Sequence, residues 1–189
     1  MASAEPIRDK KELKRFAAYY LRRGQYRNYA LVVLGIHTAL RISDLLSLKW
    51  DDVYNPENKK YRSHITLTER KTGKSKIIAL NKNVITALKL YFPYKRGVFI
   101  FANNRKNAAA ISRVQAYRIV RAAADAIKAA ARVSCHSLRK TFGYHAWRGG
   151  VAVAVIMDIY NHSRYEVTRR YLGISQDDRD KVYLDMSLI

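Results

Sequence analysis

Apolar residues recur at helical spacing along most of the chain. Leu13, Phe16 and Tyr20 lie on one face of a predicted helix over residues 10–23. The same spacing predicts further helices over approximately residues 29–40, 44–48, 82–92, 112–131, 135–148, 151–160, 163–172 and 176–185. Five helices follow a residue whose side chain can cap the first backbone N–H groups, namely Asp9, Ser43, Asn81, Ser134 and Ser163.

The period of the pattern changes to two near residue 61. Ile65 and Leu67 alternate with polar residues, and a returning strand follows the glycine-containing turn "RKTGK", so residues 61–80 are predicted to form a β-hairpin. The apolar run "GVFIF" at residues 97–101 predicts a third strand. The predicted fold class is therefore α+β, mainly helical, with a small antiparallel three-stranded sheet.

A single domain is expected for residues 1–189. The chain contains no repeat, no low-complexity tract and no linker that would divide it. Residues 1–8 are predicted to be a tail before the first helix, and residues 174–189 a C-terminal tail segment.

The charge of the chain identifies the class of partner. Lys and Arg number 36 against 15 Asp and Glu, giving a formal net charge of +21. This excess predicts a polyanion as partner, although a merely solvated basic surface is the alternative. No apolar run approaches the roughly 18 residues that span a bilayer, so no membrane partner is expected.

Cysteine usage and the N-terminus favour a cytoplasmic location. Cys135 is the single cysteine, so it can form neither an internal disulfide nor a cysteine-rich zinc site. The N-terminal residues "MASAEPIRDKKELK" lack the apolar core of a signal peptide.

Several polar motifs remain to be explained. His136 and Arg139, in "HSLRKTF", lie about 60° apart on one face of a helix. Together with "TALRISDLLSLKWDDV", "KTGK" and "NHSRYEVTRRYLGI", in that order, this motif resembles the catalytic domain of the tyrosine recombinases, or phage-type integrases. The resemblance covers roughly residues 25–175.

This resemblance implies a set of catalytic residues. In the family, a tyrosine attacks a DNA phosphate and forms a 3′-phosphotyrosyl link without a metal or cofactor, and the matching positions here are Arg41, Lys71, His136, Arg139, His162 and Tyr171.

These residue types suit the reaction on physical grounds. Two guanidinium groups, from Arg41 and Arg139, can bind the oxygens of a phosphorane. A tyrosine has a pKa of ~10, so it needs a base such as His136. The departing 5′-oxygen needs a proton, for which Lys71 is the candidate and Lys74 the alternative.

Other positions have supporting roles. Asp44 stands where the family usually has an acidic residue, and we expect it to orient Arg41; a carboxylate favoured by the helix dipole is the alternative. Asn161 stands where the family often has Gly, so a left-handed turn is expected there. Candidate DNA contacts are Lys74, Lys140 and Arg164.

The position of the nucleophile sets a geometric condition. His162 and Tyr171 are nine residues apart, which on one unbroken helix places them on opposite faces, so a turn must separate them. The alternative nucleophile is Tyr165.

The resemblance also implies partners. The predicted function is DNA cleavage and rejoining in site-specific recombination or integration of a mobile element. The alternatives are DNA relaxation like that of type IB topoisomerases, or a DNA-binding module without catalysis. We expect double-stranded DNA as partner and self-association on it, in the family a tetrameric synapse. The C-terminal segment would dock on a neighbouring protomer or on its own chain, and the family's N-terminal core-binding domain is expected to be absent.

Overall fold

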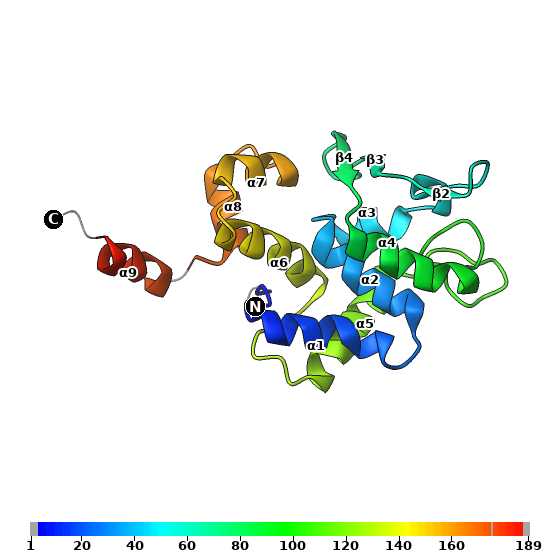
Figure 1. The fold of residues 1–189 in the computed structure, drawn as a ribbon, viewed down its shortest axis with the longest axis horizontal. Coiled ribbons are helices and arrows are strands. Elements are labelled where there is room, and N and C mark those ends of the chain that lie inside the picture. The colour runs from blue at the N-terminus through cyan, green and yellow to red at the C-terminus, as the bar shows by residue number, and fades with distance from the viewer. Residues whose placement is uncertain (1–3, 175, 187–189) are drawn as a thin grey trace.

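The protein is described by a computed structural model, which covers residues 4–174 and 176–186. Helices carry most of the chain, with short strands between the third and fourth α-helices (Figure 1). In chain order the elements are α1 (Lys10–Leu21), α2 (Tyr26–His37), α3 (Ile42–Ser47), η1 (Trp50–Asp52), β1 (Tyr54–Asn55), β2 (Lys60–Tyr61), β3 (His64–Thr68), β4 (Ser75–Ala79), α4 (Lys82–Tyr91), η2 (Phe92–Tyr94), α5 (Arg113–Ala126), α6 (Cys135–Arg148), α7 (Val153–Tyr160), α8 (Tyr165–Leu172) and α9 (Gln176–Asp185).

Three of the five predicted caps are present, whereas Ser43 lies inside α3 and Arg164, not Ser163, precedes α8, and among the described residues neither of these two helices has a side-chain cap. The side chain of Asp9 accepts a hydrogen bond from the backbone N–H of Glu12, that of Asn81 accepts from Val84, and that of Ser134 accepts from its own helix. Each cap satisfies one N–H group that the first helical turn leaves without a partner.

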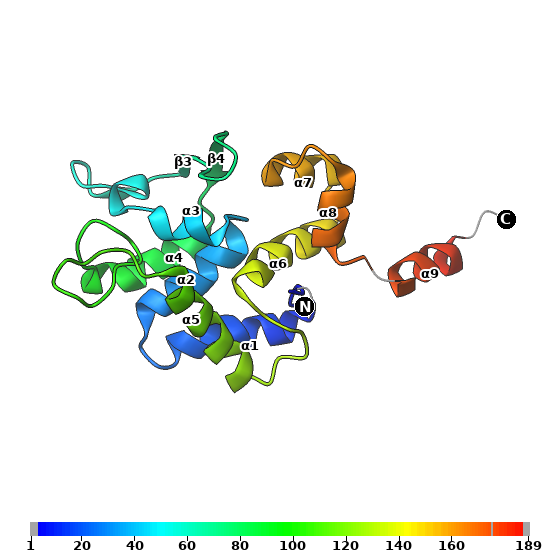
Figure 2. The same cartoon turned by 180° about the vertical axis from the view of Figure 1, so that it is seen from behind.

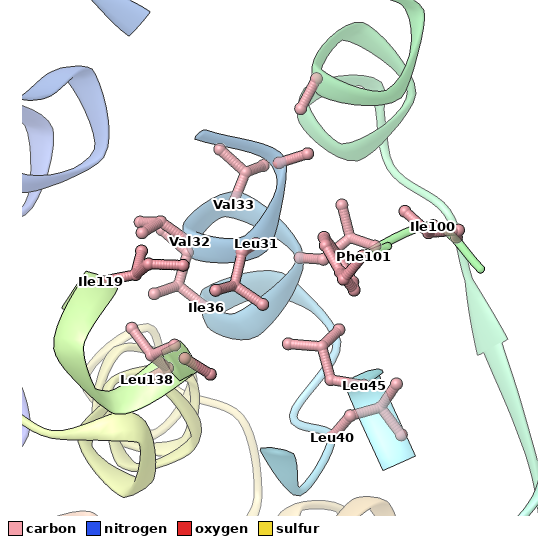
Figure 3. Packing of buried hydrophobic residues seen from close by; sticks show 14 of the residues in the cluster. Leu31, Val32, Val33, Ile36, Leu40, Leu45, Ile100, Phe101, Ile119 and Leu138 are labelled. Atoms are coloured by element: carbon pink, nitrogen blue, oxygen red, sulfur yellow. The ribbon is translucent and has the colours of Figure 1, made fainter. Parts of the chain in front are cut away.

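Helix α2 forms the centre of the main hydrophobic core. Val32 and Ile36 point from α2 toward Ile119 on α5 and Leu138 on α6 (Figure 3). α2 packs against α1, α4 and α6. Residues 30–36 of α2 are all apolar and buried, as expected for a helix surrounded by others.

One glycine allows α2 and α6 to approach closely. A Cβ atom at Gly35 would lie 2.5 Å from Cδ1 of Leu138. Because α6 carries the "HSLRKTF" motif, this close contact fixes the motif against the core.

The sheet differs in detail from the prediction. β3 and β4 form the expected antiparallel hairpin, with Ile65 opposite Ile78, but this sheet has two strands and β1 and β2 form a second two-stranded sheet. The predicted third strand at residues 97–101 makes only an isolated bridge, between Phe99 and Lys49. Ile100 is fully buried in the core, so this segment pairs with the chain that follows α3 instead of with the hairpin. The α+β, mainly helical class is confirmed.

A smaller cluster joins α6, α7 and α8. Ala39, Ile156, Tyr160 and Leu172 are fully buried in it. The hydroxyl of Tyr160 donates to the backbone carbonyl of Arg139 at 2.7 Å. The cluster therefore holds the helices with the remaining motifs against α6.

The last helix extends away from the rest of the molecule (Figures 1 and 2). Its side chains Tyr183 and Leu184 are 82% and 85% exposed. Arg148, at the end of α6, forms an ion pair with Asp178, near the beginning of α9. Among the described residues, no helix is both long and apolar enough to cross a bilayer.

Candidate active site

The structure brings the two proposed phosphate-binding arginines together. Arg41 lies in extended backbone between α2 and α3, and Arg139 lies on α6. Both point at the carboxylate of Glu69: Nη1 of Arg41 is 2.8 Å from Oε2, and Nη1 of Arg139 is 3.9 Å from Oε1. Side chains nearly 100 residues apart in sequence thus meet at one point.

Arg139 is held firmly in the interior. Its side chain is 1% exposed, and its guanidinium group donates to the carbonyl oxygens of Ala39 and Tyr160. It also lies over the ring of Tyr160, with 4.4 Å between Cζ and the ring centroid. These contacts fix the orientation of the guanidinium group of Arg139.

Sequence reasoning missed Glu69. Burial raises the pKa of its carboxyl, but hydrogen bonds from Asn161, Arg41 and Thr72 outweigh burial and lower the pKa to about 2. The signal was present in the alternation of the hairpin, because position 69 continues the inward-facing series of Ile65 and Leu67.

Lys76 was missed as well. It is 8% exposed, and its Nζ lies 3.8 Å from Oε1 of Glu69. Burial and the neighbouring Arg139 lower the pKa of Lys76 to about 8, although Glu69 acts in the opposite direction. The centre of the site therefore holds three cations and one carboxylate.

The proposed nucleophile lies between the two proposed catalytic histidines. The ring centroid of Tyr171 is 4.9 Å from that of His136 and 4.9 Å from that of His162. The guanidinium carbon of Arg139 lies 5.7 Å from the centroid of the Tyr171 ring. The phenol is thus next to Arg139 and to a possible proton acceptor.

The required turn between His162 and Tyr171 is present. α7 ends at Tyr160, and Asn161 adopts the left-handed conformation, with φ 54° and ψ 38°. His162 follows in the turn before α8, and its Nδ1 is 3.1 Å from Oγ1 of Thr168. The turn brings the imidazole back to the face of α8 that carries the tyrosine.

Both histidines are neutral at pH 7 in the DNA-free protein. Burial, followed by Lys140 and Arg139, lowers the pKa of His136 to about 4. Burial, followed by Arg139 and Arg41, lowers the pKa of His162 to about 4. A neutral imidazole can accept a proton, as a general base must.

This electrostatic setting predicts an unusual titration. The ring of His162 should titrate near pH 4 in the free protein, and nicked DNA should raise the midpoint because a phosphate adds negative charge beside the arginines. The free energy of unfolding should fall as the pH drops from 6.5 toward 4, because in this range the imidazole is protonated in the unfolded chain but not in the folded chain. NMR of the ring protons, assigned with His162→Gln, measures the midpoint. A midpoint near 6.5 in the free protein would contradict the prediction.

The hairpin places Lys71 and Lys74 at an exposed turn. The amide of Glu69 donates to the carbonyl of Lys74 at 2.9 Å, and Gly73 closes the turn with φ 67°. The charge of Lys71 contributes to the lowered pKa of His136. Lys71 thus acts electrostatically on the proposed base, while its amine stays exposed at the turn.

Asp44 has a different partner from the one predicted. It is 1% exposed, and its Oδ1 accepts from the backbone N–H of Arg70 at 3.0 Å. The acidic group paired with Arg41 is Glu69, because the hairpin passes over α3 and brings that carboxylate closer. Asp44 therefore anchors the hairpin that carries Glu69.

Lys140 is largely covered by the protein itself, and its contact with DNA stays a prediction. It is 7% exposed, and its Nζ donates to the carbonyl of Ala4 at 2.7 Å. The segment before α1 covers this face of α6, where the N–H of Ile7 also donates to Thr141. Arg164 is exposed at the start of α8, and its contact with DNA stays a prediction.

Hollows lined by arginine continue from the site across the surface. The first contains Arg41, Arg139, Arg113 and Tyr117, and adjoining hollows share lining residues with it and with one another. We call the arginines that line them the arginine track: Arg41, Arg139, Arg113, Arg70, Arg118, Arg105, Arg27 and Arg96. Among the described residues that line these four hollows there is no carboxylate, so the path is uniformly basic.

Known proteins are similar to this chain in sequence. The pattern of the Phage integrase family matches residues 8–177. The probable integrase/recombinase YoeC of Bacillus subtilis is 36% identical over 184 residues, which cover 97% of each chain. The tyrosine recombinase XerC of Pelobacter propionicus is 27% identical over 161 residues, covering 83% of this chain and 51% of the relative. The chain thus spans nearly the whole of YoeC and about half of XerC.

Solved structures show the same fold. The crystal structure of XerA recombinase matches with a TM-score of 0.77 at 21% identity, over 97% of this chain and 66% of that one. The XerH site-specific recombinase bound to palindromic difH substrate matches with a TM-score of 0.77 at 17% identity, over 97% of this chain and 53% of that one. The chain belongs to the phage integrase family, and its fold is that of the tyrosine recombinase catalytic domain.

Proposed function

We propose that this chain is a catalytic domain that breaks and rejoins double-stranded DNA in site-specific recombination. The carrying observation is that Arg41 and Arg139 converge on one carboxylate, with Arg139 beside the ring of Tyr171 and the rings of His136 and His162 in contact with that tyrosine. One DNA phosphate bound by the two guanidinium groups would lie within reach of the phenol. We further propose that it acts in the cytoplasm and that residues 1–189 form a single catalytic domain.

Each proposed residue has a step in the reaction. The phenol oxygen of Tyr171 attacks phosphorus, its proton passes to His136, and Lys71 gives a proton to the 5′-oxygen as the bond from phosphorus to that oxygen breaks. Negative charge grows on the non-bridging oxygens, where Arg41 and Arg139 bind it. His162 adds a hydrogen bond to the phosphate. Rejoining is the reverse reaction, with a 5′-hydroxyl as nucleophile.

Capture of the covalent intermediate tests this proposal. A nicked suicide duplex loses a short strand after cleavage, so a protein that uses this reaction accumulates as a 3′-phosphotyrosyl adduct. Digestion and mass spectrometry then identify the attached peptide, which should contain Tyr171. No adduct on any duplex tried, with DNA binding intact, would instead favour a binding module.

The arginine track is the proposed path of the DNA backbone. If Arg118 and Arg105 neutralise phosphates, changing either one to Gln should make the fall of log K with log salt concentration shallower by about one, where K is the binding constant for DNA. The matched control is Lys14→Gln, an exposed cation on α1 outside the track, which should leave the slope unchanged. Equal slopes for all three variants would exclude the track as the DNA path.

The exposed α9 is the proposed contact for self-association on DNA. Its apolar side chains Val182, Tyr183 and Leu184, and Met186 directly after it, are all at least half exposed in this chain. A protein cut after residue 175 should therefore form fewer multimers on DNA, as measured by light scattering. The variant Leu184→Asp should reproduce the loss, because it adds a charge that must be desolvated on docking. Unchanged self-association after truncation would exclude α9 as the contact.

A further inference from the structure

A buried carboxylate connects the separate parts of the proposed site. The side chain of Glu69 is 0% exposed, and its two oxygens face Arg41, Arg139 and Lys76 at 2.8, 3.9 and 3.8 Å. These cations come from three separate segments: the start of α3, the middle of α6 and strand β4. Without the carboxylate, three charges with little access to water would repel one another.

The same carboxylate also reaches the segments that carry the remaining proposed groups. Its Oε2 accepts from Oγ1 of Thr72 at 2.9 Å and from Nδ2 of Asn161 at 3.0 Å. Thr72 directly follows Lys71, and Asn161 directly precedes His162. One side chain thus contacts the two arginines and the neighbours of the proposed acid and of the second histidine.

We propose that Glu69 is a positioning residue, which holds Arg41 and Arg139 at the spacing of a phosphate before DNA binds and fixes the hairpin and the α7–α8 turn beside them. This inference rests on the proposed function. Because Glu69 is 0% exposed while the side chain of Arg41 is 18% exposed, the carboxylate lies on the inner side of Arg41 and leaves the exposed part of that guanidinium group available to a phosphate. Preorganised donors of this kind need no rearrangement when charge develops.

A positioning role differs in its consequences from simple neutralisation of charge. If Glu69 only balanced the charge, Glu69→Asp would keep that balance and act like the wild type. Positioning depends on the length of the side chain, because Asp is one methylene shorter and cannot reach Arg41 and Asn161 together. Both Glu69→Asp and the neutral Glu69→Gln should then react slowly while still binding DNA.

The experiment measures adduct formation and DNA affinity separately. At saturating suicide duplex, the rate constant for Glu69→Gln should fall about 10²-fold, and that for Glu69→Asp about tenfold, as misplaced catalytic groups cause. The Kd for DNA should not rise, because Glu69→Gln removes a negative charge and so makes the net charge of the protein more positive. The matched control is Glu57→Gln, an exposed carboxylate between β1 and β2, which should match the wild type. Wild-type rates for Glu69→Gln, or proportional losses of rate and affinity, would overturn the proposal.

A second readout does not depend on activity. In the free protein, NMR should show slowly exchanging guanidinium N–H signals for Arg41, and these should disappear in Glu69→Gln. If the wild type forms no adduct, the proposed function fails, yet these signals still decide whether Glu69 orders Arg41. If the wild type reacts and the signals persist in Glu69→Gln, the positioning role fails alone.

A folding defect would not leave the proposal undecided. If Glu69→Gln does not fold, the double variant Glu69→Gln with Lys76→Gln removes one buried cation together with the carboxylate. This variant should fold, because the charge balance of the interior is restored, and should still react slowly, because Arg41 has lost its partner. A double variant with the wild-type rate would overturn the positioning role.

Discussion

Replacing Tyr171 with Phe is expected to abolish covalent attachment to DNA, with the adduct rate lowered about 10⁴-fold or more, as removal of a nucleophile does. The substitution removes one oxygen and leaves the ring, whose packing against His136, His162 and Tyr160 should persist. DNA affinity and thermal stability should therefore stay close to those of the wild type. Gel analysis of the adduct on a suicide duplex, beside a Kd titration, provides the measurement.

The matched control is the alternative nucleophile. Tyr165 is 45% exposed at the first position of α8, six residues before Tyr171, so Tyr165→Phe makes the same chemical change in the same helix. This variant should react at the wild-type rate. If the adduct survived in Tyr171→Phe and vanished in Tyr165→Phe, the assignment of the nucleophile would be reversed.

Local signals in the sequence predicted the elements that carry the site. The caps at Asp9, Asn81 and Ser134 and the alternation of the hairpin depend on residues within a few positions of one another. The left-handed turn at Asn161 was predicted from the residue type that tolerates it, and it is observed. These features could be predicted because their energies are local.

The misplaced residues depend on packing between distant segments. Residues 97–101 have the composition of a strand, but burial of Ile100 in the helical core decided their position. The cover over Lys140 was not predicted either: the segment before α1 lies over this lysine, and the carbonyl of Ala4 accepts a hydrogen bond from its Nζ. Nothing in the spacing of either segment indicates its partner.

Glu69 lies between these two cases. Alternation along β3 placed its carboxylate on the inward face, so that its burial could be predicted from sequence. Its partners Arg41, Arg139 and Asn161 come from other elements and meet it only when α3, α6 and the α7–α8 turn are assembled. The burial of Glu69 could therefore be predicted from the sequence, but its contacts with the other elements could not.

Replacing Arg139 with Met is expected to lower both activity and stability. The adduct rate should fall about 10³-fold, because one of the two groups that bind developing charge is lost. The free energy of unfolding should fall by about 3–5 kcal/mol, the usual effect of removing one partner from a buried ion pair. Arg139 is 1% exposed and donates to the carbonyls of Ala39 and Tyr160, which would lose their donors along with the charge that faces Glu69. Urea denaturation and the suicide-duplex assay measure the two effects.

Arg41→Met separates the catalytic part of this effect from the structural part. The side chain of Arg41 is 18% exposed and its ion pair is with Glu69, so water can replace part of what the substitution removes. The adduct rate should fall as far as in Arg139→Met, because the phosphate again loses one of its two guanidinium groups. The loss in the free energy of unfolding should be clearly smaller than in Arg139→Met. Equal stability losses would mean that the burial of Arg139 contributes nothing beyond that of Arg41. A normal adduct rate in either variant would mean that the two guanidinium groups do not bind one phosphate.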